Sequence, residues 1–312
     1  MRYLWLAFLI GWSSSAYAAM GTSPSVDVPI TISSSGPTPP PGAVAAGFST
    51  LAFNSDFAQP FYATQSNWLG CYSPTSGFPT GTYQWYQGGW NDANEPPCNA
   101  NQVFDSVAGS NVLDVQWQPS YNNQYSRNNI VIQTENHDTT KVADFGSAYF
   151  EAALRLTAAT NPNHVPVGAF WTWGTESSRG RASPIEWDFV EFYDDPGCCG
   201  GSIHNWGNNN DPSQSIWVVP AGFDPTVYHT YGFRITSDGS TQIEGCGYLD
   251  GKLMGCIDAK ATTTEFNLRN YVVIQNGGTT SVSDLYIKYV RVWSCANWQT
   301  TMCNGTVLTG AP

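Results

Sequence analysis

The stretch Pro184–Phe192 (PIEWDFVEF) sets three carboxylates, Glu186, Asp188 and Glu191, among large apolar and aromatic side chains. The apolar residues favour extended structure, so the stretch predicts a β-strand rather than a solvated acidic loop. Burying three like charges side by side in a core is costly. We therefore expect this strand to line a surface on which the carboxylates have a chemical role.

The spacing of the three carboxylates makes a specific prediction about the strand. Residues i and i+2 share a face, so Glu186 and Asp188 point together and Glu191 points the other way in a regular strand. One extra residue in a β-bulge between Asp188 and Glu191 brings all three onto one face. We predict such a bulge, with Trp187 and Phe189 buried behind it.

Three carboxylates on one face are typical of glycoside chemistry. Two that lean to about 5–6 Å apart suit a retaining glycosidase, in which one is the nucleophile and the other the general acid/base. The central Asp188, hydrogen-bonded to Glu186 or sharing its proton, would help the two glutamates to differ in protonation. A calcium site is the competing use of clustered carboxylates, but such sites favour flexible loops over a strand rich in Trp, Phe and Val.

The rest of the chain predicts an all-β fold. Further alternating runs, separated by turn residues, lie at 112–117, 129–133, 148–156, 230–235, 271–275 and 285–293. Long helical periodicity is absent, and this pattern predicts a sandwich of two antiparallel sheets. Asp250-Gly251 reads as the tip of a hairpin, and a three-residue loop there would set Cys246 opposite Cys256.

The N-terminus predicts export. A short basic start, an apolar run too short to span a membrane and Ala16-Tyr17-Ala18 indicate a signal peptide over 1–18. Residues 19–47 are rich in Ser, Pro and Gly and predict a linker. We expect residues 48–312 to form one β-sandwich domain that carries the acidic strand. The protein would then be secreted, either to the cell exterior or to the periplasm.

The composition of the chain limits the classes of partner that we expect it to bind. The net charge of −12 argues against nucleic acid and anionic membranes. Charged residues make up 12% and aromatic residues 14% of the chain, which suits either a carbohydrate-handling surface or an aromatic β core. We expect a monomer with a polysaccharide partner.

Eight cysteines in an exported chain favour disulfides over metal sites. The pairs nearest in order are Cys71–Cys98, Cys246–Cys256 and Cys295–Cys303, while the adjacent Cys198 and Cys199 bridge each other or pair elsewhere. Sequence alone leaves this connectivity open.

The composition of segment 67–101 predicts a long aromatic loop, which would form either a binding lip or a small core under its own disulfide. Trp85 and Trp90 are its expected exposed stacking residues.

The sequence resembles glycoside hydrolase family 16 over about Phe48 to Trp293. Glu186–Glu191 (EWDFVE) is similar to the bulged E-x-D-x-x-E signature of that family. Similar flanking segments follow in the family's order: 145–152 (FGSAYFEA), 168–174 (GAFWTWG), 203–206 (IHNW), 228–231 (YHTY), 249–252 (LDGK) and 289–293 (YVRVW).

The resemblance implies a concanavalin-like β-jelly-roll with a concave substrate cleft. It implies that Glu186 is the nucleophile, Asp188 its helper and Glu191 the acid/base. Trp171 and Trp173 would stack on sugar near the scissile bond. Core packing is the alternative for these two, since in a regular strand both face the cleft or both face the core.

Three more binding residues come from matching positions in the family. His204 would contact the sugar or tune the acid/base, although a lone histidine is more often structural. Trp206 and Gln275 complete the expected substrate-binding set. No cofactor is expected, and Lys288, where an aspartate often precedes the closing strand, argues against a family-type calcium ion.

These observations predict a secreted, endo-acting, retaining β-glycosidase that cuts a β-1,3 or mixed-linkage glucan. A galactan such as agarose is the alternative substrate. Transglycosylation and a non-catalytic carbohydrate-binding jelly roll are the alternative functions.

Overall fold

The computed structural model describes residues 36–57, 64–65, 71–74, 84–88, 100–117, 129–134, 144–157, 168–174, 185–192, 200–205, 214–237, 242–260, 269–277, 283–298 and 303. Residues Pro37–Pro312 form one compact unit. Within the described ranges, no helix has the length and apolar character needed to cross a membrane.

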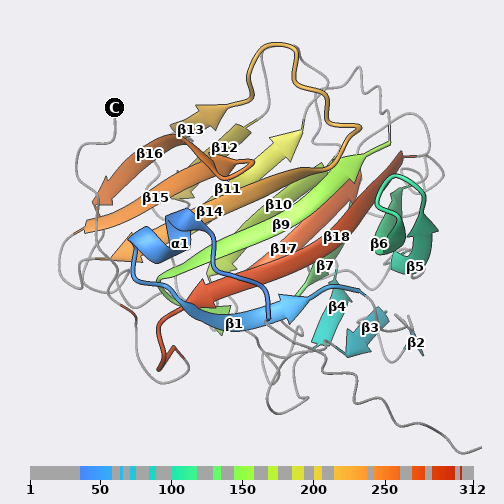
Figure 1. Cartoon of the computed structure of the whole chain (residues 1–312), viewed down its shortest axis with the longest axis horizontal. Helices are drawn as coiled ribbons and strands as arrows, with labels where there is room; N and C mark the ends of the chain where they lie inside the picture. The colour runs from blue at the N-terminus through green and yellow to red at the C-terminus, as the bar shows by residue number, and fades with distance from the viewer. Residues whose placement is uncertain are drawn as a thin grey trace, which may run out of the picture. The chain divides into compact units, whose positions relative to one another are not determined.

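The described part of the chain is almost entirely β-structure (Figure 1). Its elements in chain order are α1 (Pro41–Ala45), β1 (Thr50–Ser55), β2 (Thr64–Gln65), β3 (Cys71–Pro74), β4 (Gln84–Gly88), β5 (Ala100–Asp105), β6 (Ser110–Trp117), β7 (Asn129–Gln133), β8 (Asp144–Phe145), β9 (Ala148–Leu156), β10 (Gly168–Gly174), β11 (Ile185–Phe192), β12 (Gly200–Asn205), β13 (Gln214–Val218), β14 (His229–Ser237), β15 (Gln242–Leu249), β16 (Lys252–Lys260), β17 (Asn270–Gly277) and β18 (Ser283–Ser294).

The strands form two antiparallel sheets. The eight-stranded sheet has the order β16-β15-β14-β9-β18-β6-β5, with β1 also paired to β18. The ten-stranded sheet has the order β13-β12-β11-β10-β17-β7-β4-β3-β2, with β8 also paired to β17. The predicted all-β sandwich of two antiparallel sheets is confirmed, and the alternating runs expected to be strands lie in β6, β7, β9, β14, β17 and β18.

Aromatic rings fill the space between the two sheets. Phe189 of β11 stacks on Phe233 of β14, with ring centroids 4.5 Å apart, and lies 5.0 Å from the ring of Phe150 in β9. All three side chains are fully buried. Contacts of this kind between strands of opposite sheets fix how β11 lies on the core.

The hairpin of β15 and β16 differs from the expected one in a single detail. Its loop has two residues, because Leu249 pairs directly with Lys252, and both Asp250 and Gly251 have positive φ (51° and 76°). An irregularity after Gly247 supplies the missing residue, so Cys246 still pairs with Cys256. The predicted Cys246–Cys256 disulfide is therefore confirmed.

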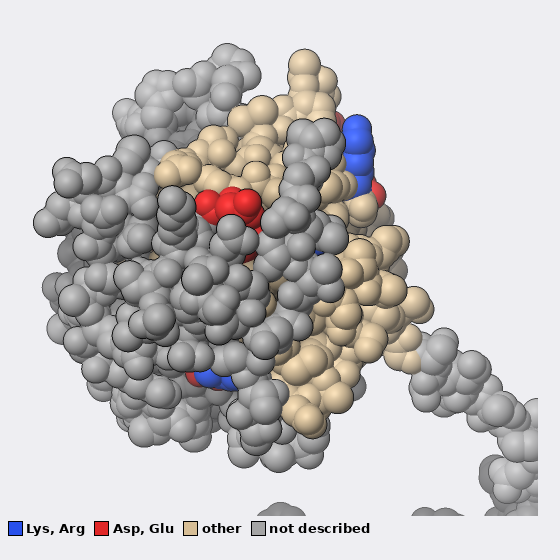
Figure 2. Space-filling view, turned by 90° about the vertical axis from the view of Figure 1, so that its left-hand side faces the viewer, with Lys and Arg blue, Asp and Glu red and all other residues tan. Residues whose placement is uncertain are grey.

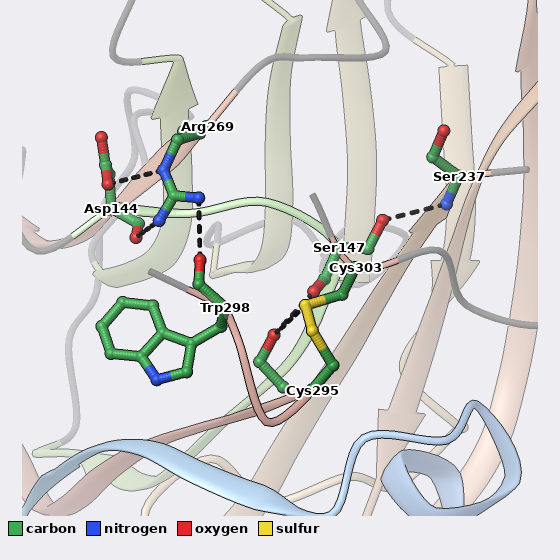
Figure 3. Close-up of a disulfide and its surroundings, with 8 residues drawn as sticks. Asp144, Ser147, Ser237, Arg269, Cys295, Trp298 and Cys303 are labelled. Atoms are coloured by element: carbon green, nitrogen blue, oxygen red, sulfur yellow. Dashed lines mark hydrogen bonds and ion pairs between the residues drawn. A yellow bond between two sulfur atoms is a disulfide. The ribbon is translucent and has the colours of Figure 1, made fainter. Parts of the chain in front are cut away.

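The Cys295–Cys303 disulfide is also confirmed and ties the segment after β18 to the sandwich (Figure 3). Cys303 Sγ lies 3.2 Å from Ser294 Oγ, and that hydroxyl donates to the Ser147 carbonyl at 3.0 Å. The bridge is thus held against the start of β9. The Cys71–Cys98 pair and the Cys198/Cys199 pair lie outside the described side chains.

The compact unit begins earlier than the linker prediction placed it. The helix α1 lies inside the expected linker 19–47, yet Ala43 and Ala46 are buried. A Cβ at Gly42 would lie 2.8 Å from ring atoms of Tyr149 and Tyr248, so glycine lets this turn approach β9 and β15 closely. The small residues of this segment, whose composition predicts a linker, here allow α1 to pack closely against the sheet. The signal-peptide prediction concerns residues outside the described part.

Candidate active site

The acidic strand β11 carries the predicted bulge. On the β12 side, Asp188 pairs with Ser202 but Glu191 pairs with Gly200, so three steps along β11 match two along β12. On the β10 side, Trp171 pairs with Asp188 and the adjacent Phe170 pairs with Val190, so Phe189 is the extra residue of β11. The bulge prediction is confirmed.

The bulge separates the apolar and acidic side chains of β11 onto opposite faces. Trp187, Phe189 and Val190 are all buried in the core between the sheets. Asp188 is only 2% exposed, while Glu186 and Glu191 are half-buried. Since the consecutive residues Phe189 and Val190 both turn inward, the alternation of side chains shifts by one residue, and Glu191 returns to the face of Asp188.

The next strand, β12, supplies hydrogen-bond partners to the carboxylates. Ser202 Oγ donates to Asp188 Oδ2 at 2.7 Å and lies 3.4 Å from Glu191 Oε2. His204 Nε2 lies 3.0 Å from the same Asp188 oxygen and 3.3 Å from Ser202 Oγ. These four side chains form one connected polar cluster on the outward face of the ten-stranded sheet.

The electrostatics of the cluster favour a charged His204. The hydrogen bond with Asp188 raises the pKa of His204 above its ordinary value, burial opposes this, and the charges of Asp188 and Glu191 add to the rise. Glu186 pairs directly with His204 across the two strands. The imidazole thus contacts Asp188 directly and occupies the position of β12 opposite Glu186, and its role toward sugar or the acid/base stays a prediction.

The tryptophans of β10 lie on the same face as the carboxylates. Trp171 pairs with Asp188 across β10 and β11, so the two side chains share a face. Trp171 and Trp173 pack edge to face, 6.0 Å apart, in an apolar cluster separate from the main core. These two side chains therefore lie outside the core between the sheets, buried within a second apolar cluster on the carboxylate face. They are only 5% and 8% exposed, and stacking on sugar stays a prediction.

Gln275 of β17 lies beside this cluster. It pairs with Ala169 of β10, whose other partner is Glu191. Its side chain is half-buried, unlike the buried residues around it. The structure thus places Gln275 on the carboxylate face, and its binding of substrate stays a prediction.

The prediction that Trp85 is an exposed stacking residue is wrong. Its side chain is 1% exposed and packs edge to face on Phe53, with ring centroids 5.6 Å apart. Its Nε1–H donates to Ser55 Oγ at 3.0 Å, which satisfies the one polar group of the buried indole. Trp85 is therefore a core residue that joins β4 to β1. Trp90 and Trp206 lie outside the described residues.

Ser202 is the site residue that the sequence analysis missed. The signal was present, because Ser202 and His204 are two apart on one strand and so share a face. A serine carries no charge and no ring, so it does not stand out unless the register with Asp188 is known.

Two groups of side chains among the described residues have metal-ligand spacing. Asp188, Glu191 and His204 bring ligand atoms within 4.8 Å of one another. Glu244, Cys246 and Cys256 do the same, but both cysteines are in a disulfide and offer no thiolate. In the first group, His204 Nε2 lies 3.0 Å from Asp188 Oδ2, and a protonated imidazole has no lone pair for a metal, so the spacing of this group is explained by its own hydrogen bonds.

Acidic character is also visible on the molecular surface. Figure 2 shows one face on which described Asp and Glu atoms form a compact patch, with Lys and Arg atoms in separate places away from it.

The comparisons with known proteins identify the fold. No protein-family model and no curated protein matches the sequence. Among solved structures, LamAcat from Zobellia galactanivorans matches with a TM-score of 0.52 at 16% identity, over 80% of this chain and 99% of that chain.

Two further structures match in the same way. One is a variant of SCLam, a non-specific endo-β-1,3(4)-glucanase of family 16 crystallised with 1,3-β-D-cellobiosyl-cellobiose (TM-score 0.51, 16% identity, 79% of this chain and 94% of that chain). The other is a variant of LamA from Z. galactanivorans in complex with laminaritriose and laminaritetraose (TM-score 0.50, 15% identity, 79% and 100%). The chain therefore has the β-sandwich fold of the laminarinases and other glucanases of glycoside hydrolase family 16.

Proposed function

We propose that this protein is an exported, endo-acting, retaining β-glycosidase that hydrolyses a β-1,3 or mixed-linkage glucan. One observation carries the proposal: the bulge of β11 puts Asp188 and Glu191 on one face with His204, and Glu186 is half-buried opposite His204. A structural strand has no use for this arrangement, because it gathers like charges at a cost.

In the proposed reaction, Glu186 attacks the anomeric carbon while Glu191 gives its proton to the departing glycosidic oxygen. The bond between that carbon and the leaving oxygen breaks as the bond to Glu186 forms. Glu191, now a carboxylate, then takes a proton from water, which attacks the same carbon and frees Glu186. Two displacements restore the β configuration.

Asp188 and His204 support this cycle without joining the covalent steps. Asp188 is nearly fully buried and is held by Ser202 and His204, so its carboxylate is fixed beside those that react. A positively charged His204 offsets the negative charge that the three carboxylates concentrate. Trp171 and Trp173 give the same face an aromatic wall against which sugar C–H groups can pack.

The choice of a glucan is supported by the solved structures of the same fold, which hold glucan oligosaccharides. Export is supported by the N-terminal pattern and by two disulfides in the sandwich.

The test is product formation from soluble β-1,3-glucan, mixed-linkage β-glucan and agarose. We expect new reducing ends from a glucan and, by NMR, a β anomer as the first product. Release of reducing ends from agarose alone would show that the substrate is a galactan and not a glucan. Binding without any release would show a carbohydrate-binding protein, and an α anomer would overturn the retaining mechanism.

A further inference from the structure

The hydroxyl of Ser202 lies at the centre of the polar cluster. It is within 3.4 Å of one oxygen of Asp188, one of Glu191 and the Nε2 of His204. The three contacts differ in length, and the one to Asp188, at 2.7 Å, is the shortest. In the resting site the hydroxyl hydrogen therefore points to Asp188.

A hydroxyl has one hydrogen and can serve only one carboxylate at a time. His204 Nε2 lies 3.0 Å from the same Asp188 oxygen, so its N–H can hold Asp188 alone when the hydroxyl turns away. Among the described residues, the second carboxylate oxygen within reach of Ser202 Oγ is Glu191 Oε2, at 3.4 Å. A rotation about one side-chain bond thus moves the hydrogen bond from one carboxylate to the other.

We propose that Ser202 is a positioning residue whose hydroxyl follows the negative charge between Asp188 and Glu191 during the reaction. This rests on the proposed function. When Glu191 has given its proton to the leaving oxygen, Ser202 O–H turns to the new carboxylate and His204 N–H keeps Asp188. When Glu191 regains a proton from water, the hydroxyl returns. No proton passes through Ser202, so the steps of the cycle are unchanged.

In the described part of the chain, the ionisable groups nearest to Ser202 come from two strands. They are Glu186, Asp188 and Glu191 of β11, and His204 of β12. The described residues of β10 and β13, which flank this pair of strands, contain no ionisable side chain. Of the side chains that the structure describes, these four groups are therefore the ones whose titration a change at Ser202 can alter.

The test compares two leaving groups. We use the glucan that the wild type cleaves and the 4-nitrophenyl glycoside of its oligosaccharide product, whose leaving group departs without a proton. Ser202→Ala should lower kcat/KM on the glucan about tenfold, the effect of one hydrogen bond to a charged group, and on the nitrophenyl substrate less than about twofold. The alkaline limb of the glucan profile should move to higher pH, because ionised Glu191 loses a donor.

Two further variants separate this role from a structural one. Ser202→Thr keeps the hydroxyl and should restore most of the glucan activity. Ser106→Ala removes an exposed serine of the β5–β6 turn in the other sheet and should change neither substrate. Unfolding curves of each variant show whether the fold is kept.

The outcomes are distinct. Equal loss on both substrates, no loss on either, or an unmoved alkaline limb would overturn the role of Ser202 while leaving the glycosidase intact. A wild type that releases nothing from any glycan would overturn the proposed function itself.

Discussion

Asp114 on β6 should make the stability of this protein fall as the pH rises from about 4 to about 7. Its side chain is 8% exposed, and its Oδ1 has no hydrogen-bond partner among the described residues. Burial, and then the charge of Asp284, raises the pKa of Asp114 from 3.8 to about 7, although Arg155 opposes the rise. The native protein therefore keeps a proton on Asp114 that the unfolded chain loses near pH 4.

The size of the effect follows from the two pKa values. Each tenfold change in proton affinity is worth about 1.4 kcal/mol, so the free energy of unfolding should fall by up to about 4 kcal/mol between about pH 4 and pH 7. The sign is fixed: a carboxyl whose pKa is higher in the folded state stabilises it below the unfolded pKa and loses that effect as the pH reaches the folded value. Above about pH 7 the loss is complete.

The perturbation is Asp114→Asn, which keeps the shape of the neutral carboxyl and cannot ionise. Urea unfolding followed by tryptophan fluorescence at about pH 4 and about pH 8 measures the effect. Relative to wild type, the variant should gain up to about 4 kcal/mol more at the higher pH than at the lower. Asp258→Asn, at an exposed position of β16, is the matched control and should show no such gain. Parallel profiles for wild type and Asp114→Asn would refute the reasoning.

Two other parts of the fold give sharp predictions. Arg155 donates to both carboxylate oxygens of the buried Asp105, at 3.0 and 2.9 Å, so Arg155→Met should cost about 2 kcal/mol at neutral pH in urea unfolding. Burial opposes ionisation of Asp105, but the hydrogen bonds from Arg155 and Tyr228 outweigh it and lower the pKa of Asp105 to about 2. The loss of stability caused by Arg155→Met should therefore shrink as the pH falls from about 4 toward 2. A loss that grows over this pH range would contradict the assignment. A Cβ at Gly247 would overlap the buried indole of Trp217, so Gly247→Ala should cost about 1–3 kcal/mol, whereas Gly36→Ala, with open space around it, should cost far less.

The fold and the geometry of the acidic strand were predictable because both rest on strand periodicity. Glu186, Asp188 and Glu191 cannot share a face in a regular strand, and a core does not tolerate them, so a bulge was the one arrangement consistent with both facts. The structure has that bulge. The β15–β16 hairpin followed for a similar reason, since Asp-Gly is a strong turn signal.

What the sequence did not show depends on contacts between distant segments. Trp85 is in the core because its indole N–H donates to Ser55 and its ring packs on Phe53, two residues of β1 that lie about 30 positions earlier in the chain. The small residues of α1 pack because Tyr149 and Tyr248 leave room for a glycine. Ser202 matters because the register of β12 sets it opposite Asp188. Composition and local spacing carry none of this information.

The central claim is that the bulged strand holds the two reacting carboxylates of a glycosidase. The most direct measurement is the release of reducing ends from soluble β-1,3-glucan and mixed-linkage β-glucan by wild type, Glu186→Gln and Glu191→Gln, with the fold of each checked by its unfolding curve. Removing either carboxylate should lower the rate by at least about a thousandfold while polymer binding is kept. Full activity in either folded variant would contradict the claim.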